Sequence, residues 1–146
     1  MREGNLDKRY QTLIVLWFAL LMSVGLYFAL ALLVAPAAVS ERSNPTRSLW
    51  IVALTALGTV LVIFSFAVKQ KLLERSVEQQ DVSLVQKALV IACAMCEASA
   101  LLGLLERFLV GNREYYLLFL FAAAGIVFHF PRRNQLESAS YKNPVV

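Results

Sequence analysis

The chain has 146 residues, of which 59% are hydrophobic, and it carries a formal net charge of +4 at pH 7. A soluble domain of this length needs more polar surface than such a composition provides. The composition therefore excludes an ordinary soluble domain. The positive charge gives no support to nucleic-acid binding either, because it lies in the short segments between apolar runs.

Four apolar runs account for the composition, and they cover residues 12–35, 49–68, 82–105 and 115–130. A helix needs about 20 residues to cross the hydrocarbon core of a bilayer. The first three runs reach that length and the fourth falls just short of it. None alternates with period two, and an open sheet cannot face lipid. The sequence predicts an all-α, polytopic membrane protein with four transmembrane helices in two antiparallel hairpins, forming one membrane domain over 1–146.

The first run resembles a secretory signal at its ends, with basic residues before it and the small-residue sequence "APA" at 35–37. Its apolar part is nearly twice as long as the core of a typical signal peptide. We therefore interpret it as a retained span. The loop that follows, 36–48, is rich in Pro, Ser and Asn and is expected to be irregular, with Ser48 capping the second helix.

The distribution of charge predicts the orientation in the membrane. Ten of the 14 Lys and Arg residues lie in the N-terminal segment, in the 69–87 connection and in the C-terminal tail. The positive-inside rule places these three segments in the cytoplasm. We therefore expect a multi-pass protein of the cell (inner or plasma) membrane with both termini cytoplasmic. Aromatic residues at the run ends agree, with Trp50, Tyr115 and Tyr116 at the outer surface and Tyr10 at the inner one.

The 69–87 connection contains no Gly or Pro and is rich in helix-forming residues. We expect the second and third helices to continue beyond the lipid and to meet in a tight turn near 79–83. Asp81 or Ser83 is the predicted N-cap of the third helix.

Glycine, asparagine and proline mark the end of the third run and the end of the fourth. A short loop between the third and fourth runs turns at Gly111–Asn112, and Pro131 ends the fourth helix. The tail 134–146 has no apolar period, so we expect it to be mobile or bound to a partner.

Glu97 is the strongest functional signal, because it lies about 15 residues into the third run and so close to the bilayer midplane. An ionised carboxylate there costs at least about 2.5–3.5 kcal/mol. No Lys or Arg lies at matching depth in the other runs. We expect a mostly neutral acid that exchanges a proton when water or a cation approaches. The alternative is a protonated acid that only hydrogen-bonds a neighbouring helix.

Small side chains follow one stripe of the third helix at three- and four-residue spacing, and they favour close helix packing in a membrane. The stripe consists of Ala88, Ala92, Cys96, Ser99 and Gly103. Gly58 lies on a comparable small and polar side of the second helix, which we also interpret as a helix contact. Glu97 lies off the stripe and is expected to face a further element.

The remaining reactive residues have simpler interpretations. Cys93 and Cys96 form a C-x-x-C motif, but no second pair or His lies at their depth, so we expect packing rather than a metal site. His129 is interpreted as an interfacial residue, and Glu106 and Arg107 as a pair in water. We find no nucleophile–base set, phosphate loop or haem ligand pair, and therefore expect no enzyme and no cofactor.

The sequence "KLLERSVEQQD" (71–81), followed by "LVIACAMCEASALLGLL", resembles the proteolipid c subunit of rotary ATP synthases. That subunit carries a mid-membrane carboxylate in the context E-A-x-x-x-x-G-L, and these places are held here by Glu97, Ala98, Gly103 and Leu104. The resemblance covers about residues 55–105 and implies that Glu97 picks up and releases a coupling ion. The apolar part of the second helix contains no Gln, which favours a proton over sodium.

The sequence thus leads to two hypotheses. In the first, the chain is a membrane subunit in which Glu97 binds a proton, by itself or within a larger ion-translocating complex. In the second, it is a structural or accessory subunit that stabilises a larger complex, with Glu97 as one interhelical hydrogen bond. Both imply the lipid bilayer and other membrane subunits or further copies as partners, and neither involves nucleic acid.

Overall fold

The computed structural model describes residues 3–34, 45–112 and 114–140, and over these residues the chain is entirely helical apart from short connections. The prediction of an all-α fold is confirmed for this part of the chain. The elements are α1 (Glu3–Leu33), α2 (Pro45–Glu78), α3 (Val82–Leu105), the single π-helical turn η1 (Glu106–Val110), α4 (Tyr116–Phe128) and α5 (Arg133–Ser140).

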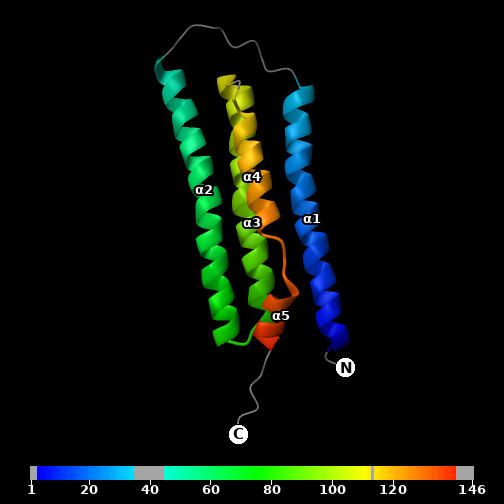
Figure 1. Ribbon diagram of the computed structural model, residues 1–146. Coiled ribbons are helices and arrows are strands. Elements are labelled where there is room, and N and C mark those ends of the chain that lie inside the picture. Colours follow the sequence, from blue (N-terminus) through cyan, green and yellow to red (C-terminus); the bar gives the residue numbers. More distant parts are fainter. Residues whose placement is uncertain (1–2, 35–44, 113, 141–146) are drawn as a thin grey trace.

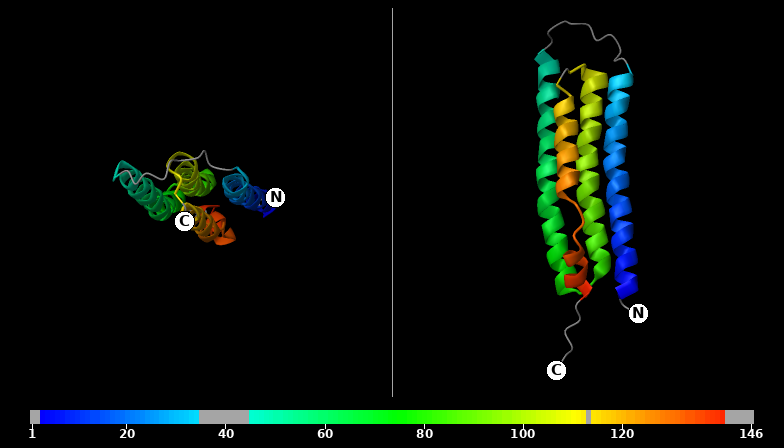
Figure 2. Two further views of the ribbon diagram at one scale, coloured as in Figure 1. Left: turned by 90° about the horizontal axis from the view of Figure 1, so that it is seen from above. Right: turned by 45° about the vertical axis from the view of Figure 1, so that its right-hand side comes forward.

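The long helices lie side by side in an elongated bundle (Figure 1). Seen along the bundle axis, α1 and α2 occupy opposite sides, and α3 and α4 lie between them (Figure 2). α3 contacts every other helix, while α5 packs against the ends of α1, α2 and α3. This central position of α3 means that any group on it faces a neighbouring helix.

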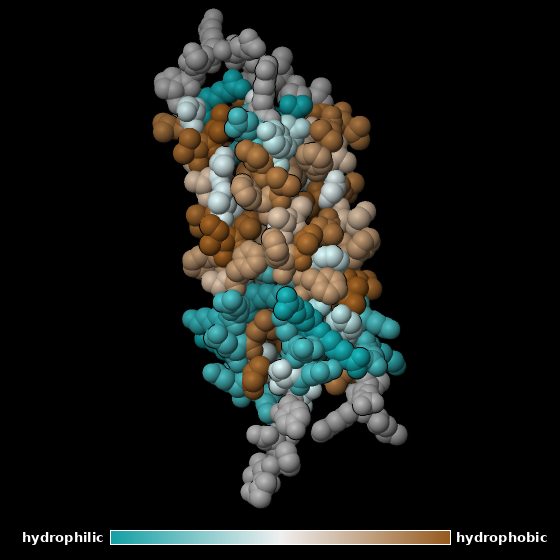
Figure 3. All heavy atoms as spheres, viewed as in Figure 1, coloured by the Kyte–Doolittle hydropathy of each residue, from teal (hydrophilic) through white to brown (hydrophobic). Residues whose placement is uncertain are grey.

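Three segments are long and apolar enough to cross a membrane, and they cover residues 6–33, 46–78 and 82–110. α4 is apolar as well but has only 13 residues, or about 20 Å of helix. Large apolar side chains are exposed around the bundle, among them Val15, Phe18, Met22, Val52, Val60 and Ile63. In Figure 3 the apolar surface covers the upper part of the molecule, above a hydrophilic band near the α5 end.

The turn between α2 and α3 has the predicted position and cap. α2 ends at Glu78 and α3 begins at Val82. Asp81 Oδ1 accepts a hydrogen bond from the Ser83 backbone N–H, and Oδ2 accepts one from the Ser83 hydroxyl, both at 2.8 Å. These bonds hold the pKa of the Asp81 carboxyl below its ordinary value, the hydroxyl having the largest effect. The predicted N-cap is therefore confirmed as Asp81.

The start of the second helix differs from the prediction. α2 begins at Pro45, so Ser48 lies within its first turn and is not its cap. Proline is favourable at the first position of a helix because its fixed φ suits the helix and the missing N–H has no partner to lose. Residues 45–48 of the segment expected to be irregular are therefore helical, and residues 36–44 lie outside the described part.

The C-terminal tail 134–146 was expected to be mobile or bound to a partner, but the structure packs part of it against the bundle of the same chain. Residues 133–140 form α5, whose Leu136 and Ala139 are buried against the bundle. Arg133 holds the helix in place through ion pairs with Asp7 of α1 at 3.2 Å and with Glu137 at 3.0 Å. Residues 141–146 of the expected tail lie outside the described residues.

The short helix α4 is fastened by side chains from two other helices. Trp17 of α1 donates its indole N–H to the carbonyl of Ile126 at 2.7 Å, and Lys69 of α2 donates from Nζ to the carbonyl of His129 at 3.0 Å. Both carbonyls lie at the C-terminal end of α4, where a helix leaves carbonyl groups without helical partners. The end of α4 is thus tied to α1 and α2.

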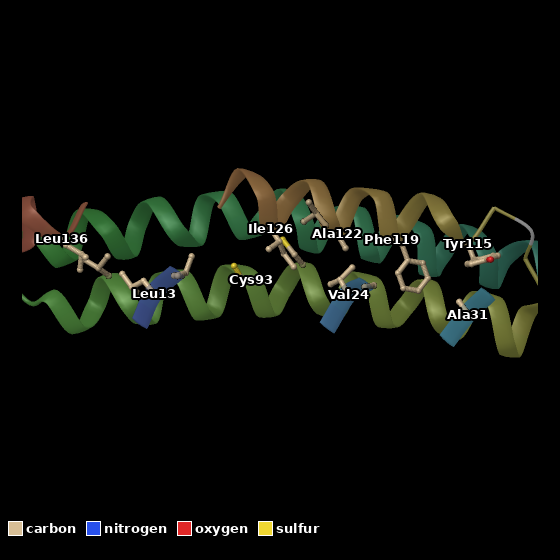
Figure 4. Packing of buried hydrophobic residues seen from close by; sticks show 14 of the residues in the cluster. Leu13, Val24, Ala31, Cys93, Tyr115, Phe119, Ala122, Ile126 and Leu136 are labelled. Carbon is tan, nitrogen blue, oxygen red and sulfur yellow. The ribbon is translucent and has the colours of Figure 1, made fainter. Parts of the chain in front are cut away.

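Small residues bring α2, α3 and α4 close together. A Cβ added at Gly125 of α4 would lie 2.7 Å from Sγ of Cys96, and one added at Gly58 of α2 would lie 2.7 Å from Cδ2 of Leu118. The apolar core between α1, α3 and α4 continues along the bundle to α5 (Figure 4). Its labelled residues are Leu13, Val24, Ala31, Cys93, Tyr115, Phe119, Ala122, Ile126 and Leu136.

Candidate functional site

Glu97 lies on α3 and faces α1, where two hydroxyl groups reach its carboxyl. Ser23 Oγ is 2.6 Å from Oε1 of Glu97, and the Tyr27 hydroxyl donates to the same oxygen at 3.1 Å. Ser23 and Tyr27 are four residues apart, so they share the face of α1 that packs against α3. The carboxyl is half-buried, and its other oxygen accepts no hydrogen bond from the described donors.

The Ser23 hydroxyl has one proton and two possible acceptors. Its oxygen lies 2.6 Å from Oε1 of Glu97 and 2.8 Å from the carbonyl oxygen of Leu20. If Glu97 is ionised, Ser23 donates to the carboxylate. If Glu97 is protonated, the acid can donate to Ser23 Oγ while Ser23 donates to Leu20. The Ser23 hydroxyl can therefore donate a hydrogen bond in both protonation states of the acid.

No cation neutralises Glu97 within the described part of the chain. The ion pairs found there both involve Arg133, which binds Asp7 and Glu137 near the α5 end. The polar groups that contact Glu97 are thus two neutral hydroxyls. Neutral donors stabilise an ionised carboxylate less than a fixed positive charge would.

The small-residue stripe lies on another side of α3. Its five members are all buried: Ala88, Ala92, Cys96, Ser99 and Gly103. Gly103 and Gly58 are both close to Leu118 of α4, and a Cβ at Gly58 would lie 3.0 Å from Oγ of Ser99. The stripe is therefore covered by α2 and α4 of the same chain, while Glu97 faces α1.

Glu106 differs from its expected position in water, because it is almost completely buried. Thr55 of α2 donates to its Oε1 at 2.6 Å, and the side-chain amide of Asn112 donates to its Oε2 at 2.8 Å. The backbone N–H of Asn112 also donates to the Glu106 carbonyl at 3.0 Å. Glu106 begins the π-helical turn, and this turn points its carboxyl inward between α2 and the loop.

Arg107 is not paired with Glu106, contrary to the expectation. Its Nε donates to the carbonyl of Ala31 at 3.3 Å, and its guanidinium lies 4.9 Å from the centre of the Tyr115 ring. The residue thus joins the end of α1 to α3 and α4. Arg47 of α2 similarly donates to the Gly111 carbonyl at 2.9 Å, so each arginine joins two elements through a backbone carbonyl.

His129 was interpreted as interfacial, but the structure buries it at the end of α4. Its Nε2 lies 2.8 Å from Oγ of Ser65, and its ring lies 4.4 Å from the Phe66 ring. α4 ends just before it, at Phe128, and the next residue, Phe130, packs against Trp17 of α1 with ring centres 5.1 Å apart. The Ser65 hydroxyl also donates to the Val62 carbonyl at 2.6 Å. This Ser–His pair is buried on both sides, so no substrate can reach it as described.

The partners of Glu97 were missed by sequence reasoning, although a signal existed. Ser23 and Tyr27 are polar side chains at four-residue spacing within an apolar run, which is the pattern expected of one polar face. Cys93 and Cys96 are buried as free thiols. Among the described residues no group of three or more His, Cys, Asp or Glu could hold a metal ion.

Comparison with protein families, with curated proteins and with solved structures finds no significant match to this chain. The resemblance to the ATP synthase proteolipid therefore remains an interpretation of short motifs. The α2–α3 hairpin has the order that this interpretation requires. The donors to Glu97, however, come from α1, which has no counterpart in the two-helix subunit.

Proposed function

We propose that the chain is an integral membrane protein with four membrane-embedded helices and both termini in the cytoplasm of the cell. The three long apolar helices and the apolar surface around the bundle support insertion. The concentration of Lys and Arg in the segments near α5 supports the orientation. In this arrangement α4 reaches only part of the way across, and the chain between α4 and α5 completes the inner side.

Within this protein, we propose that Glu97 binds and releases a proton. The observation that carries the proposal is the Ser23 hydroxyl, which can serve either the carboxylate or the Leu20 carbonyl. The change of protonation state then requires the rotation of one hydroxyl and no movement of a helix. The half-buried position of Glu97 also leaves one carboxyl oxygen without a described donor and open to an incoming proton carrier.

The proposed cellular role is that of a subunit in an ion-translocating membrane complex, with proton exchange as its contribution. The proteolipid resemblance supports this chemistry at Glu97. Its small-residue stripe is covered by α2 and α4 of the same chain, so the proposal does not include a ring built through that stripe. Other membrane subunits or further copies would then bind through the exposed apolar faces.

Carbodiimide labelling in native membranes tests the proposal, because carbodiimides modify protonated carboxyl groups that lie within lipid. We expect Glu97 to be labelled, and labelling to fall as pH rises. The peptide that contains Glu97 also contains Glu106, which serves as an internal control and should remain unlabelled. Labelling at Glu106 alone, or none in the wild type, would overturn the proposal. Glu97→Gln should abolish the signal without changing helix content.

The second candidate function is that of an accessory subunit in which Glu97 is a fixed link between helices. It is favoured by the fact that both described donors to Glu97 come from the single helix α1. The Glu97→Gln variant separates the two functions, because Gln keeps an acceptor for Tyr27 but carries no exchangeable acid. If transport by the parent complex survives this change while assembly fails, Glu97 is architectural and the proton-binding proposal is wrong.

A further inference from the structure

The early end of α4 brings two cations together at the inner side of the bundle. Between α4 and α5 the chain runs against α2, where Lys69 Nζ donates to the carbonyl of His129 at 3.0 Å. Arg132 follows three residues later, at the start of α5. The break in the last helix therefore holds a buried lysine and an arginine at the same level of the molecule.

Lys69 is a buried cation without a counter-charge. It is only 9% exposed, and the His129 carbonyl is the acceptor that the structure gives it. An ammonium has three N–H donors, so two remain for other partners. No described carboxylate lies within 4.0 Å of Lys69 or of Arg132, since both ion pairs involve Arg133. Burying a charge is unfavourable unless a partner compensates for it, so an anion close to Lys69 would be stabilising.

A groove of about 420 Å³ between α2 and α5 is lined by Arg132, and Lys69 lies outside its lining, four residues before Leu73 on α2. The wall on the α5 side is polar, and the wall on α2 is mixed, with two apolar and two polar residues. The lining consists of Leu73, Glu74, Ser76, Val77, Arg132, Asn134, Gln135 and Ser138. The polar wall offers a guanidinium, two amides and a hydroxyl, which are donors suited to an oxyanion. Glu74 is the one acid in the lining, and its side chain is exposed to solvent.

The level of this α2–α5 groove fits a lipid headgroup. α5, which supplies one wall of the groove, lies at the level of the hydrophilic band that borders the apolar part of the bundle (Figures 1 and 3). On the apolar side of this border, Phe66 of α2 and Phe128 of α4 pack against each other with ring centres 6.5 Å apart, and both are exposed. An acyl chain could lie over these rings while its phosphate group reaches the cations below.

We propose that the α2–α5 groove is a binding site for an anionic phospholipid of the inner leaflet. Arg132 binds the phosphate group directly, and Lys69 supplies the second positive charge from the membrane side. Basic pockets between membrane helices on the cytoplasmic side are suited to such headgroups. The inference rests on the proposed membrane insertion and is independent of proton exchange at Glu97.

Native mass spectrometry of the full chain tests this site after reconstitution into phosphatidylcholine nanodiscs with an added fraction of phosphatidylglycerol. Incorporation into the phosphatidylcholine discs tests membrane insertion by itself. After release into detergent, the wild type should retain phosphatidylglycerol in preference to phosphatidylcholine. A chain that inserts but retains both lipids equally overturns the lipid site and leaves the proposed insertion intact.

Variants locate the site. Arg132→Gln changes an exposed side chain, and we expect about fivefold weaker retention of phosphatidylglycerol, the effect of about one lost surface charge. Glu74→Gln should strengthen retention, because it removes the acid from the groove. Lys87→Gln is the matched control, since Lys87 is an exposed cation of α3 that does not line the groove. If Lys87→Gln weakens retention as much as Arg132→Gln, the effect is one of total charge and the site is refuted.

Inorganic phosphate distinguishes a lipid site from a general phosphate site. Added at constant ionic strength, it should leave the retained phosphatidylglycerol unchanged, because the acyl chains add binding that free phosphate lacks. Displacement of the lipid by phosphate would overturn the assignment to a phospholipid.

Discussion

Glu97 and Glu106 are two acids on one continuous helical stretch, and they differ in burial and in hydrogen bonding. Glu106 is almost completely buried, and both of its oxygens accept hydrogen bonds, one from α2 and one from the following loop. Glu97 is less buried, and the described bonds reach only one of its oxygens, from a single helix. The two acids therefore differ in their burial and in how many of their carboxyl oxygens accept hydrogen bonds.

The largest effect on the free energy of unfolding is expected from removing Glu106, the acid whose two carboxyl oxygens both accept hydrogen bonds. Glu106→Ala leaves Thr55 and Asn112 without their acceptor, and we expect the free energy of unfolding to fall by about 3 kcal/mol. Glu97→Ala should cost about 1 kcal/mol, because hydrogen bonds between membrane helices are usually weak. Unfolding by dodecyl sulfate in mixed micelles, followed by circular dichroism, measures both. If Glu97→Ala lowered the free energy of unfolding more than Glu106→Ala does, Glu97 would be the more important acid for stability and the comparison would be wrong.

A double-mutant cycle sharpens the assignment of Glu106. Thr55→Val and Glu106→Gln each disturb the 2.6 Å contact between α2 and the π-helical turn. The two changes should be non-additive, with a coupling energy of about 1.5 kcal/mol. The same unfolding assay applied to the wild type, both single variants and the double variant gives this value. If the two losses of unfolding free energy were additive, the hydrogen bond from Thr55 would not be what stabilises the position of Glu106.

The Ser23 hydroxyl is expected to contribute less to stability. Ser23→Ala should lower the free energy of unfolding by about 0.6 kcal/mol, the average for a hydrogen bond between membrane helices. Ser23→Thr, which keeps a hydroxyl at this position, should restore most of the loss. A cost near that of Glu106→Ala would show that Glu97 is as firmly fixed as Glu106.

The smallest effect concerns Asp81, an acid outside the apolar part of the bundle that serves as a reference for the other two. Hydrogen bonds from Ser83 lower the pKa of Asp81 in the folded protein. The resulting stabilisation is fully present above the ordinary pKa of an aspartate, and it is lost as pH falls through the lowered value. Unfolding measured against pH should show this loss in the wild type. In Asp81→Asn, which keeps a capping side chain without a titrating group, the loss should disappear.

Local patterns in the sequence predicted much of the fold. The apolar run 82–105 coincides with α3, and Asp81 caps that helix as its position before the run indicated. Gly111 takes the left-handed conformation at the predicted turn, with φ of 67°. These features depend on neighbouring residues along the chain, which is why composition and spacing were sufficient to find them.

The errors concern contacts between distant residues. The burial of Glu106 depends on Thr55, 51 residues earlier, and on a π-helical turn that leaves no clear pattern in the sequence. The burial of His129 depends on Ser65 of α2 and on the direction of the chain after α4. α5 is a short polar helix with two buried residues, Leu136 and Ala139, and so few apolar positions give no detectable period.

The fastening of α4 has a consequence for biosynthesis. Trp17 and Lys69 hold its final carbonyls from helices that leave the ribosome earlier. The Trp17 bond cannot form before Ile126 has been made, and the Lys69 bond cannot form before His129 has been made. Until then, the indole N–H of Trp17 on α1 and the ammonium of Lys69 on α2 lack these acceptors. α4 therefore completes the contacts that join α1 and α2 through their polar side chains, and a chain truncated before Ile126 would lack both bonds.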